Sequence, residues 1–468
     1  MFDGAKGNPI HSSPLAVDEF HRYERRRLKA AIALVGVWSL TAALHLLLWG
    51  QWVVYGLTLF VGLHLLRLLW CRPSAWPEAL PSWQDTSSAE RLTTDLTPWP
   101  TVSILVAAKN EVRVVERLAK SLMAIDYPPT QFDVWLIDDN STDGTSQLMD
   151  RLAERYENLS VVHRDEAAIG GKSGALNQVW PMTTGSLLLV FDADAQIAPD
   201  CLRRAVPLFQ QEQVGAVQLR KAITNRAHNF WTRGQVAEMA FDAYCQFKRV
   251  AVDGIGELRG NGQFVRRTAL EHCGGWNEET ITDDLDLTLK LHVSGWDVPL
   301  MMTPYVREEG VTSLLSLWHQ RNRWAEGGYQ RYLDYWRLIN PRRLGWSKTW
   351  DLAIFWLIQY GLPTAAFPDF ALAIARNRPP MLLPLSSAAA LFATIGMAQG
   401  LRRTQSASPF SILVQTLRGM VYMTHWLLIV ATVTFRMAIR PKRLKWVKTQ
   451  HGDDDDGTVI EASVSSQP

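Results

Sequence analysis

The stretch LLLVFDADAQ, residues 187–196, is an apolar run of strand length that ends in two acids one residue apart. A strand buried inside a parallel sheet has such a continuous apolar pattern, and ligands collect beyond the carboxyl ends of parallel strands. Mg²⁺ usually binds through one or two carboxylates together with substrate phosphates. Asp192 and Asp194 therefore predict a site for Mg²⁺, or alternatively Mn²⁺, that holds a diphosphate. A solvated surface turn could carry the same acidic pair, so the prediction depends on what surrounds it.

Strand-like and helix-like patterns alternate on both sides of this stretch. Other apolar runs of strand length occupy residues 102–108, 134–139, 159–164 and 214–220. Helical spacing lies between them, at residues 111–124, 145–156, 174–180 and 200–210. Such alternation is typical of βαβ units. It predicts an α/β fold with a doubly wound, Rossmann-like mixed sheet over residues 101–310.

Two long apolar stretches precede this domain. Residues 30–49 and 51–70 each approach the ~20 residues that span a bilayer. Residues 30–72 are therefore predicted to form two transmembrane helices after a polar tail at 1–29. Basic residues before the first helix and near the end of the second place both flanks in the cytoplasm. A cleaved signal peptide is not expected because the apolar region is too long and begins too far into the chain.

His45, His64 and Arg67 fall inside or near the ends of these two stretches. We interpret them as residues that snorkel or contact neighbouring helices rather than as functional groups. A proline-punctuated polar segment at 73–100 then reads as a linker between the membrane region and the domain.

The chain returns to the membrane after residue 310. Residues 311–345 mix Trp and Tyr with Arg, which is typical of helices lying along a membrane surface, although packing on the domain explains their second half equally well. Further apolar stretches at 351–375, 381–400 and 411–435 make 346–436 a second transmembrane region. The tail at 437–468 begins strongly basic, which predicts a cytoplasmic end and an even number of crossings. If each of the five apolar stretches crossed the membrane once, the number of crossings would be odd, which conflicts with that prediction. The stretch that contains Pro363, Pro368 and Asp369 is therefore expected to be broken or re-entrant.

The composition excludes several functional classes. Lys and Arg number 48 against 46 Asp and Glu, and a formal net charge of +2 gives no reason to expect a nucleic-acid partner. Four scattered cysteines without C-x-x-C spacing predict neither a zinc site nor a disulfide framework. Nothing in the sequence indicates an oligomeric state.

Acidic and polar residues also follow the first two strands of the domain. Asn110 and Glu111 come after the first strand and are candidates for ribose or base contacts. Asp138 and Asp139 come after the second, where an acidic side chain can accept hydrogen bonds from a nucleotide. Capping of the next helix is the structural alternative for this segment, and Asn140, Ser141 or Asp143 could provide that cap without either aspartate.

Three further motifs complete the set. GGKSGALN, residues 170–177, has glycines that let the backbone approach phosphate and Lys172 as a positive charge, but it lacks the spacing of a P-loop. In TDDLD, residues 282–286, Asp283 and Asp284 begin a helical pattern, and one of them could be a general base. In QRNRW, residues 320–324, Arg323 supplies a guanidinium suited to diphosphate and Trp324 an indole suited to stacking. Gln320 begins the motif and is a further candidate for substrate binding.

Five motifs in a fixed order, with predicted membrane spans on both sides, resemble those of the membrane-embedded GT-A glycosyltransferases of family two. The motifs are IDDN, GGKSGALN, FDAD, TDD and QRNRW. That family includes cellulose, chitin and hyaluronan synthases, and the resemblance covers about residues 100–340. It implies that Asp138 and Asp139 hold a uridine, that Lys172 and Arg323 face the diphosphate, and that Asp284 is the catalytic base. Processive members have T-E-D where this chain has T-D-D, a departure that leaves the base position in place.

Longer segments resemble a narrower group in that family, the glycolipid synthases of cyanobacteria. These include RGNGQFVRR, CGGWNEETITDDLDLT, WHQRNRWAEGG and RPKRLKWVK. This resemblance covers most of the chain, and it implies transfer of glucose from UDP-glucose to the hydroxyl of diacylglycerol, with inversion. It also implies an integral membrane protein of the plasma or thylakoid membrane with its catalytic domain facing the cytoplasm.

Two other functions share these motifs. A processive polysaccharide synthase would use the same acids but would need a channel for its polymer. A non-catalytic membrane scaffold could bind a nucleotide sugar without transferring it. No motif distinguishes glucose from galactose as the donor hexose, because the two differ at one hydroxyl.

Overall fold

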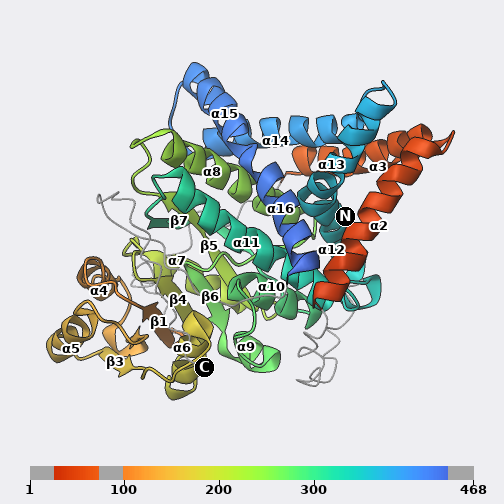
Figure 1. The fold of residues 1–468 in the computed structure, drawn as a ribbon. Coiled ribbons are helices and arrows are strands. Elements are labelled where there is room, and N and C mark those ends of the chain that lie inside the picture. Colours follow the sequence, from red (N-terminus) through yellow and green to blue (C-terminus); the bar gives the residue numbers. More distant parts are fainter. Residues whose placement is uncertain (1–25, 73–98, 441–468) are drawn as a thin grey trace, which may run out of the picture.

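The computed structural model describes residues 26–72 and 99–440, which form a sheet-based half and a helical half (Figure 1). The predicted linker at 73–100 lies almost wholly outside the described residues, as do most of the predicted tails at 1–29 and 437–468.

A seven-stranded mixed sheet forms the core of the first half. Its strand order is β3-β2-β1-β4-β6-β5-β7, and β6 alone runs antiparallel to its neighbours. The strands are β1 (Val102–Ala108), β2 (Phe132–Asp138), β3 (Leu159–His163), β4 (Leu187–Asp192), β5 (Ala216–Ile223), β6 (Gln263–Arg266) and β7 (Leu300–Glu308). The predicted α/β fold with a doubly wound mixed sheet is therefore confirmed. The sequence patterns had indicated neither β6 nor β7.

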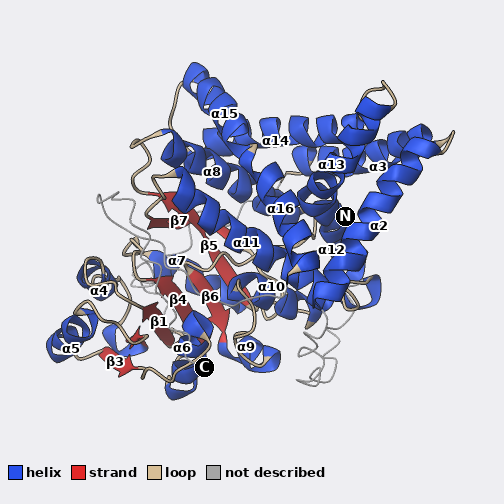
Figure 2. Ribbon diagram, viewed as in Figure 1, coloured by secondary structure: helices blue, strands red, loops and turns tan. Residues whose placement is uncertain are grey.

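Helices cover both faces of this sheet (Figure 2). They are α4 (Val115–Met123), α5 (Thr145–Arg155), α6 (Gly171–Val179), α7 (Cys201–Ala205), α8 (Phe230–Ala251), α9 (Arg267–Cys273) and α10 (Asp283–Val293), with 3-10 turns η2 (Pro129–Gln131), η3 (Trp180–Met182) and η4 (Val206–Gln210). Residues of α4, α5 and α7 share one apolar core with one face of the sheet, and residues of α6, α9 and α10 share another with the opposite face.

The position of the central strand β4 explains why its sequence is a continuous run of apolar residues. Side chains alternate between the two faces of a sheet, so Leu187, Leu189 and Phe191 enter one core while Leu188 and Val190 enter the other. Since helices cover both faces, every one of these side chains is buried. The strand therefore holds its C-terminal acids on a rigid support.

The second half is helical (Figure 2). It contains α2 (Arg26–Leu46), α3 (Gly50–Trp70), α11 (Leu314–Tyr335), α12 (Pro341–Trp356), the π-turn η5 (Leu357–Gly361), α13 (Leu362–Ala375), α14 (Leu383–Thr404), α15 (Pro409–Met423) and α16 (His425–Ile439). Within the described ranges, three helical segments are long and apolar enough to span a membrane: α2, α3, and α15 with α16 together.

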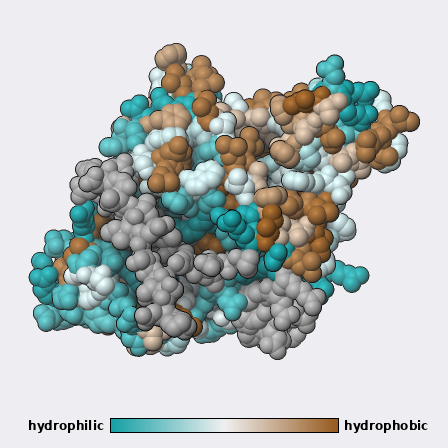
Figure 3. Space-filling model, in the orientation of Figure 1, coloured by the Kyte–Doolittle hydropathy of each residue, from teal (hydrophilic) through white to brown (hydrophobic). Residues whose placement is uncertain are grey.

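The surface of the helical half is apolar. Large apolar side chains of α2 and α3 are exposed, including Leu40, Trp52 and Leu59. Figure 3 shows apolar residues gathered over the helices in the upper part of the view and polar residues over the sheet domain below. Because soluble surfaces rarely expose apolar patches of this extent, this half associates with a membrane.

Residues 351–375, expected to be broken or re-entrant, stay helical throughout and contain a π-turn instead. Pro363 has no N–H to donate to the carbonyl four residues earlier, and in this turn Leu362 N–H bonds the Leu357 carbonyl five residues back. Pro368 leaves the Thr364 carbonyl without its helical donor, and Trp38 Nε1 bonds that carbonyl at 3.1 Å. The expected break is therefore wrong: the π-turn and the Trp38 donor compensate for the two prolines, and the helix continues. The number of crossings remains a prediction.

The ionisable residues of the first two helices contact neighbouring helices, as expected. His45 Nε2 lies 2.7 Å from Asp369 Oδ1, and His64 Nε2 lies 3.6 Å from Asp351 Oδ1. Arg67 donates to the Val252 carbonyl at 3.0 Å, which ties α3 to the end of α8.

The region expected to hold interfacial helices, 311–345, consists mainly of the single helix α11. Its first turn exposes Leu314 and Leu315, whereas residues 327–333 are buried. These buried residues pack near α10, α16 and α2, so the second half of the helix belongs to the protein interior. Helix α8 also lies against α14 and α15. The two halves are therefore joined through α8 and α11.

Candidate active site

The two acids that follow β4 face positively charged and acidic neighbours. Asp192 forms an ion pair with Lys172, whose Nζ also donates to the Gly260 carbonyl at 3.2 Å. Burial by itself would lower the pKa of Lys172, but Asp192, Asp283 and Asp284 together raise it. Burial would raise the pKa of Asp192, and the Lys172 ammonium outweighs it and lowers that pKa. Both side chains are therefore charged at neutral pH.

Asp194 lies deeper than Asp192, with 8% of its surface exposed. Its Oδ2 accepts a hydrogen bond from Glu309 N at 3.2 Å. The neighbouring Glu308 pairs with Lys221 at 2.8 Å, and burial, together with Asp194 and Asp192, raises the Glu308 pKa. Asp192 and Asp194 thus act electrostatically on a carboxyl group of β7, and the negative charge they add to this region favours a cation.

The TDD motif begins helix α10, with Thr282 as its N-cap residue. Burial and then the charge of Asp283 raise the pKa of Asp284 to about 6. Burial also raises the pKa of Asp283, whose Oδ2 is buried without a hydrogen-bond partner in the described part of the chain. A carboxylate with a pKa close to neutrality is well suited to general-base catalysis.

The two aspartates of IDDN have different surroundings. Asp139 lines the central cavity and forms an ion pair with Arg164, which also donates to the Gly171 carbonyl at 3.1 Å. Asp138 does not line it. Its carboxylate accepts hydrogen bonds from Ser141 N at 3.1 Å and Ser146 Oγ at 2.6 Å, so it holds the loop that follows β2. The expected substrate contact of Asp138 is therefore not supported by its position.

Asn110 and Glu111 also differ in whether they line the cavity. Glu111 lines the cavity. Asn110 lies outside the lining, and its Oδ1 accepts a hydrogen bond from Thr142 N at 2.7 Å. Its φ of 57° is in the left-handed region, which Asn tolerates better than most residues. Asn110 thus orders the loop that follows β2, and its predicted substrate contact is not supported either.

The glycine-rich segment leads directly into α6. Gly170 has a φ of 84°, and a Cβ there would lie 2.4 Å from Glu278 Oε2. Only glycine satisfies both conditions. Gly170, Gly171, Lys172 and Ser173 line the cavity, so the N-terminus of α6 faces it. Backbone N–H groups at a helix N-terminus favour an anion such as phosphate.

Gln320, Arg323 and Trp324 extend from α11 to the cavity. Asp192, Asp284 and Asp283 all act electrostatically on Arg323, which places its guanidinium among the acids of two motifs. Close packing fixes this helix, because a Cβ at Gly327 would lie 2.3 Å from Thr282 Oγ1. The Trp324 ring is covered by Arg321, whose guanidinium carbon lies 4.0 Å from the ring centroid.

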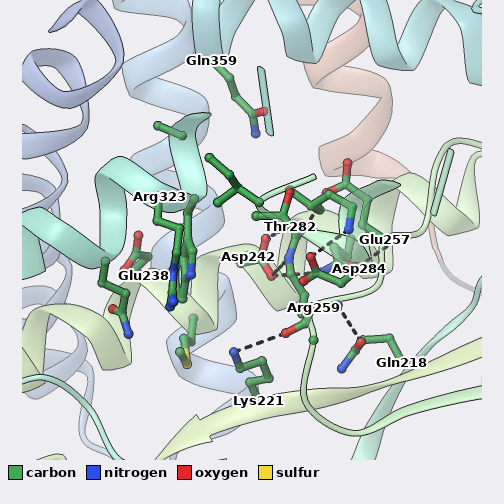
Figure 4. A pocket seen from close by; sticks show the side chains of 18 of the residues that line it. Gln218, Lys221, Glu238, Asp242, Glu257, Arg259, Thr282, Asp284, Arg323 and Gln359 are labelled. Carbon is green, nitrogen blue, oxygen red and sulfur yellow. Dashed lines mark hydrogen bonds and ion pairs between the residues drawn. The ribbon is translucent and has the colours of Figure 1, made fainter. Parts of the chain in front are cut away.

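One cavity of about 1090 Å³ brings these groups together. Its lining includes Asp139, Asp194, Asp284 and Arg323, which are up to 184 positions apart in the sequence. From this polar end it continues between helices of the helical half, where apolar residues line it. Those of α12, α13, α14 and α16 include Phe355, Leu362, Ala366, Ala389, Ala390, Phe392, Leu427 and Val430. Figure 4 shows Arg323, Asp284 and Gln359 among the side chains that line it.

Several residues of this site had no sequence signal. Arg164 pairs with Asp139, and Lys221 pairs with Glu308. Arg259 bonds Asp242 at 2.6 Å and lies beside Asp284, whose pKa it lowers against the effect of burial. Arg164 and Lys221 could have been noted as basic residues at or near the ends of strands. The pairing of Arg259 required knowledge of which segments meet.

The donor set fits a divalent cation held jointly with phosphate. Within residues 26–72 and 99–440, no group of three or more His, Cys, Asp or Glu side chains is placed so that it could hold a metal ion by itself. Asp192 and Asp194 provide hard oxygen ligands beside the anion-binding end of α6, and Mg²⁺ completes its coordination with phosphate and water in such sites.

Acids at the strand ends of a doubly wound mixed sheet, with a cavity that extends into an apolar helical half, are typical of a membrane-associated GT-A glycosyltransferase. Residues 100–327 match the model of the "Glycosyltransferase like family 2" family. Among solved structures, the mannosyltransferase PcManGT from Pyrobaculum calidifontis, in complex with GDP-Man and Mn²⁺, shares the fold. Its TM-score is 0.54 at 22% identity, over 85% of this chain and 99% of that one.

Curated relatives are more specific. The beta-monoglucosyldiacylglycerol synthase of Nostoc sp. is 54% identical over 92% of this chain and 90% of its own length. The enzyme of the same name from Synechocystis sp. is 51% identical over 93% and 90%. The chain therefore belongs to the beta-monoglucosyldiacylglycerol synthase family, and the family predicted from its motifs is confirmed. Its members are glycosyltransferases that make a glycolipid.

Proposed function

We propose that the protein transfers glucose from UDP-glucose to the free hydroxyl of 1,2-diacylglycerol, with inversion, to give β-monoglucosyldiacylglycerol. The observation that carries this proposal is the one cavity that joins charged strand-end residues to an apolar space between helices of the helical half. A nucleotide sugar is polar and a diacylglycerol is mostly apolar, so an enzyme that joins them needs both environments in contact. The names of the relatives fit the same reaction.

The donor would bind at the polar end. Asp139 and Glu111 lie where a uridine would enter, and Asp139 is held by Arg164. Lys172 and the N-terminus of α6 would bind the diphosphate, with Arg323 on the opposite side. As the sugar–phosphate bond breaks, negative charge grows on the leaving UDP. Positively charged groups fixed in advance around that charge supply a large part of catalysis.

Asp194 and Asp192 would hold Mg²⁺ or Mn²⁺. When bound, such an ion neutralises charge on the diphosphate. The ion pair between Asp192 and Lys172 orients the carboxylate toward the same end of the cavity, so the two residues bind the donor region from adjacent positions.

Asp284 would remove the proton from the lipid hydroxyl as its oxygen attacks the anomeric carbon. A single displacement from the opposite face inverts the configuration. Because burial and Asp283 raise the Asp284 pKa to about 6, the carboxylate remains mostly ionised at pH 7 yet is a stronger base than an exposed aspartate. Gln320 and Trp324 would line the place where the acceptor enters.

The membrane location follows the same reasoning. The basic flanks of α2 and α3 support a cytoplasmic catalytic domain, where UDP-glucose is made available, in either the plasma or the thylakoid membrane. The acceptor would enter sideways from the bilayer, through the part of the cavity that lies between helices.

Purified protein in lipid nanodiscs tests the proposal. UDP-glucose and UDP-galactose should be supplied separately with diacylglycerol, and the masses of the lipid products should be measured by mass spectrometry. The proposal predicts one hexose per lipid and preference for UDP-glucose. A ladder of hexoses would favour the processive synthase. Preference for UDP-galactose would show that the proposed donor, UDP-glucose, is wrong. Absence of any transfer would favour the non-catalytic scaffold.

A further inference from the structure

The π-turn η5 lies between α12 and α13, two helices whose apolar side chains line part of the cavity. Gln359 is the central residue of this turn and lines the cavity, as do Ile358 and Tyr360. Figure 4 shows the Gln359 amide on the opposite side of Arg323 and Asp284 from Lys221. π-turns inside helices occur often at functional sites, because they redirect side chains that a regular helix would place elsewhere.

The turn is fixed to the catalytic motifs by direct contacts. Tyr360 donates a hydrogen bond to the Ala325 carbonyl at 3.2 Å, and its ring stacks on Tyr329 at 5.1 Å between centroids. A Cβ at Gly328 would lie 2.3 Å from the Tyr360 hydroxyl, so the absence of a side chain there allows the approach. The adjacent Gly327 packs against Thr282 in the same way. Gln359 is therefore held at a defined position relative to the TDD motif.

The Gln359 amide lies in apolar surroundings. Its side chain is exposed to the cavity, and it makes no hydrogen bond with any other described residue. The nearby lining from α12, α13 and α14 is mostly hydrocarbon, including Phe355, Leu362, Ala366, Ala390 and Phe392. Because no described residue bonds it, the Gln359 amide is available to a ligand that enters the cavity.

We propose that Gln359 is a specificity-determining residue that donates a hydrogen bond to an acyl ester carbonyl of the acceptor lipid, while an acyl chain occupies the apolar end of the cavity. This inference rests on the proposed function. In that reaction the lipid hydroxyl lies at Asp284, so the ester carbonyls are the strong acceptors that remain near the glycerol. They lie between the hydroxyl and the chains, and Gln359 lines the same cavity as Asp284 and the apolar residues of α12, α13 and α14.

The test compares an ester acceptor with an ether acceptor. Dialkylglycerol has the same hydroxyl and chains as diacylglycerol but lacks both carbonyl oxygens. For the native protein, kcat/KM should be about three- to tenfold higher with the ester, since one hydrogen bond accounts for that ratio. Gln359→Leu should lower the ester value to the ether value and leave the ether value unchanged.

A matched control separates recognition from folding. Gln415 lies in α15, outside the cavity lining, and its side chain bonds Ser411 Oγ at 3.0 Å. Gln415→Leu should leave the ester-to-ether ratio at its native value. A Gln359→Leu variant that keeps the native ratio, or that loses activity equally with both lipids, would overturn the assignment. If the native protein glycosylates neither lipid, the proposed function fails and this inference fails with it.

Discussion

Replacing the base of the TDD motif tests chemistry and stability together. Asp284→Asn keeps the size of the side chain and removes its ability to accept a proton. General-base catalysis contributes about 10²- to 10⁴-fold, so kcat should fall by at least about a hundredfold while UDP-glucose still binds. Binding should survive because Lys172, Asp139 and the N-terminus of α6 are untouched.

The same substitution should not destabilise the protein. The Asp284 pKa rises from an ordinary value of 3.8 to about 6 in the folded state, because burial and Asp283 disfavour the charged form. Ionisation of Asp284 therefore costs stability above pH 6 and costs nothing below about pH 4. The shift corresponds to as much as about 3 kcal/mol at pH 7, at about 1.4 kcal/mol per pH unit. Asn carries no charge, so the variant should unfold at the same temperature as the native protein or higher.

Three measurements check this prediction. Mass spectrometry of the lipid product gives kcat, titration calorimetry gives UDP-glucose affinity, and thermal unfolding in nanodiscs gives stability. Asp253→Asn is a suitable control because Asp253 is exposed, lies outside the cavity and has a positive φ that Asn accepts. Turnover of Asp284→Asn within tenfold of the native rate would refute the assignment of the base.

Three other predictions follow from the same contacts. Asp283→Asn should move the acid limb of the pH–rate profile to lower pH, because the charge of Asp283 raises the Asp284 pKa; an unmoved limb would contradict the coupling. Gly327→Ala should lower kcat and the unfolding temperature, because overpacking against Thr282 costs about 1–3 kcal/mol, and the gain in helix propensity is only about 1 kcal/mol; native values for both would show that the packing is not tight. Removal of divalent cations with EDTA should abolish transfer, and Mg²⁺ or Mn²⁺ should restore it, whereas full activity in EDTA would exclude the ion at Asp194.

The parts of the fold that the sequence predicted depend on local patterns. β1, β2, β3, β4 and β5 are apolar runs beside helical spacing, and both signals persist over many residues. β6 has only four residues, too few for a pattern. β7 contains Pro304, which argues against a strand. The proline is tolerated because β7 is the edge strand and its register with β5 shifts just there.

The site was predictable to the extent that strand ends converge. Acids after parallel strands must meet at one edge of the sheet, so Asp139 and Asp192 could be placed together before any coordinates. Which of two adjacent acids faces the cavity could not be predicted. Asp138 faces Ser141 and Ser146 instead because the loop after β2 needs acceptors for its own donors. The partners of Asp284 depend on long-range packing through Gly327, which no local pattern reports.

The most direct test of the central claim is a cryo-electron microscopy structure of Asp284→Asn in nanodiscs with UDP-glucose, Mg²⁺ and diacylglycerol. The claim is that one cavity holds the nucleotide sugar and the lipid at the same time. We expect the diphosphate beside Lys172 and Asp194, the glycerol hydroxyl beside residue 284, and an acyl chain between α13 and α14. Density for the lipid at any site that is not continuous with the nucleotide would contradict the account.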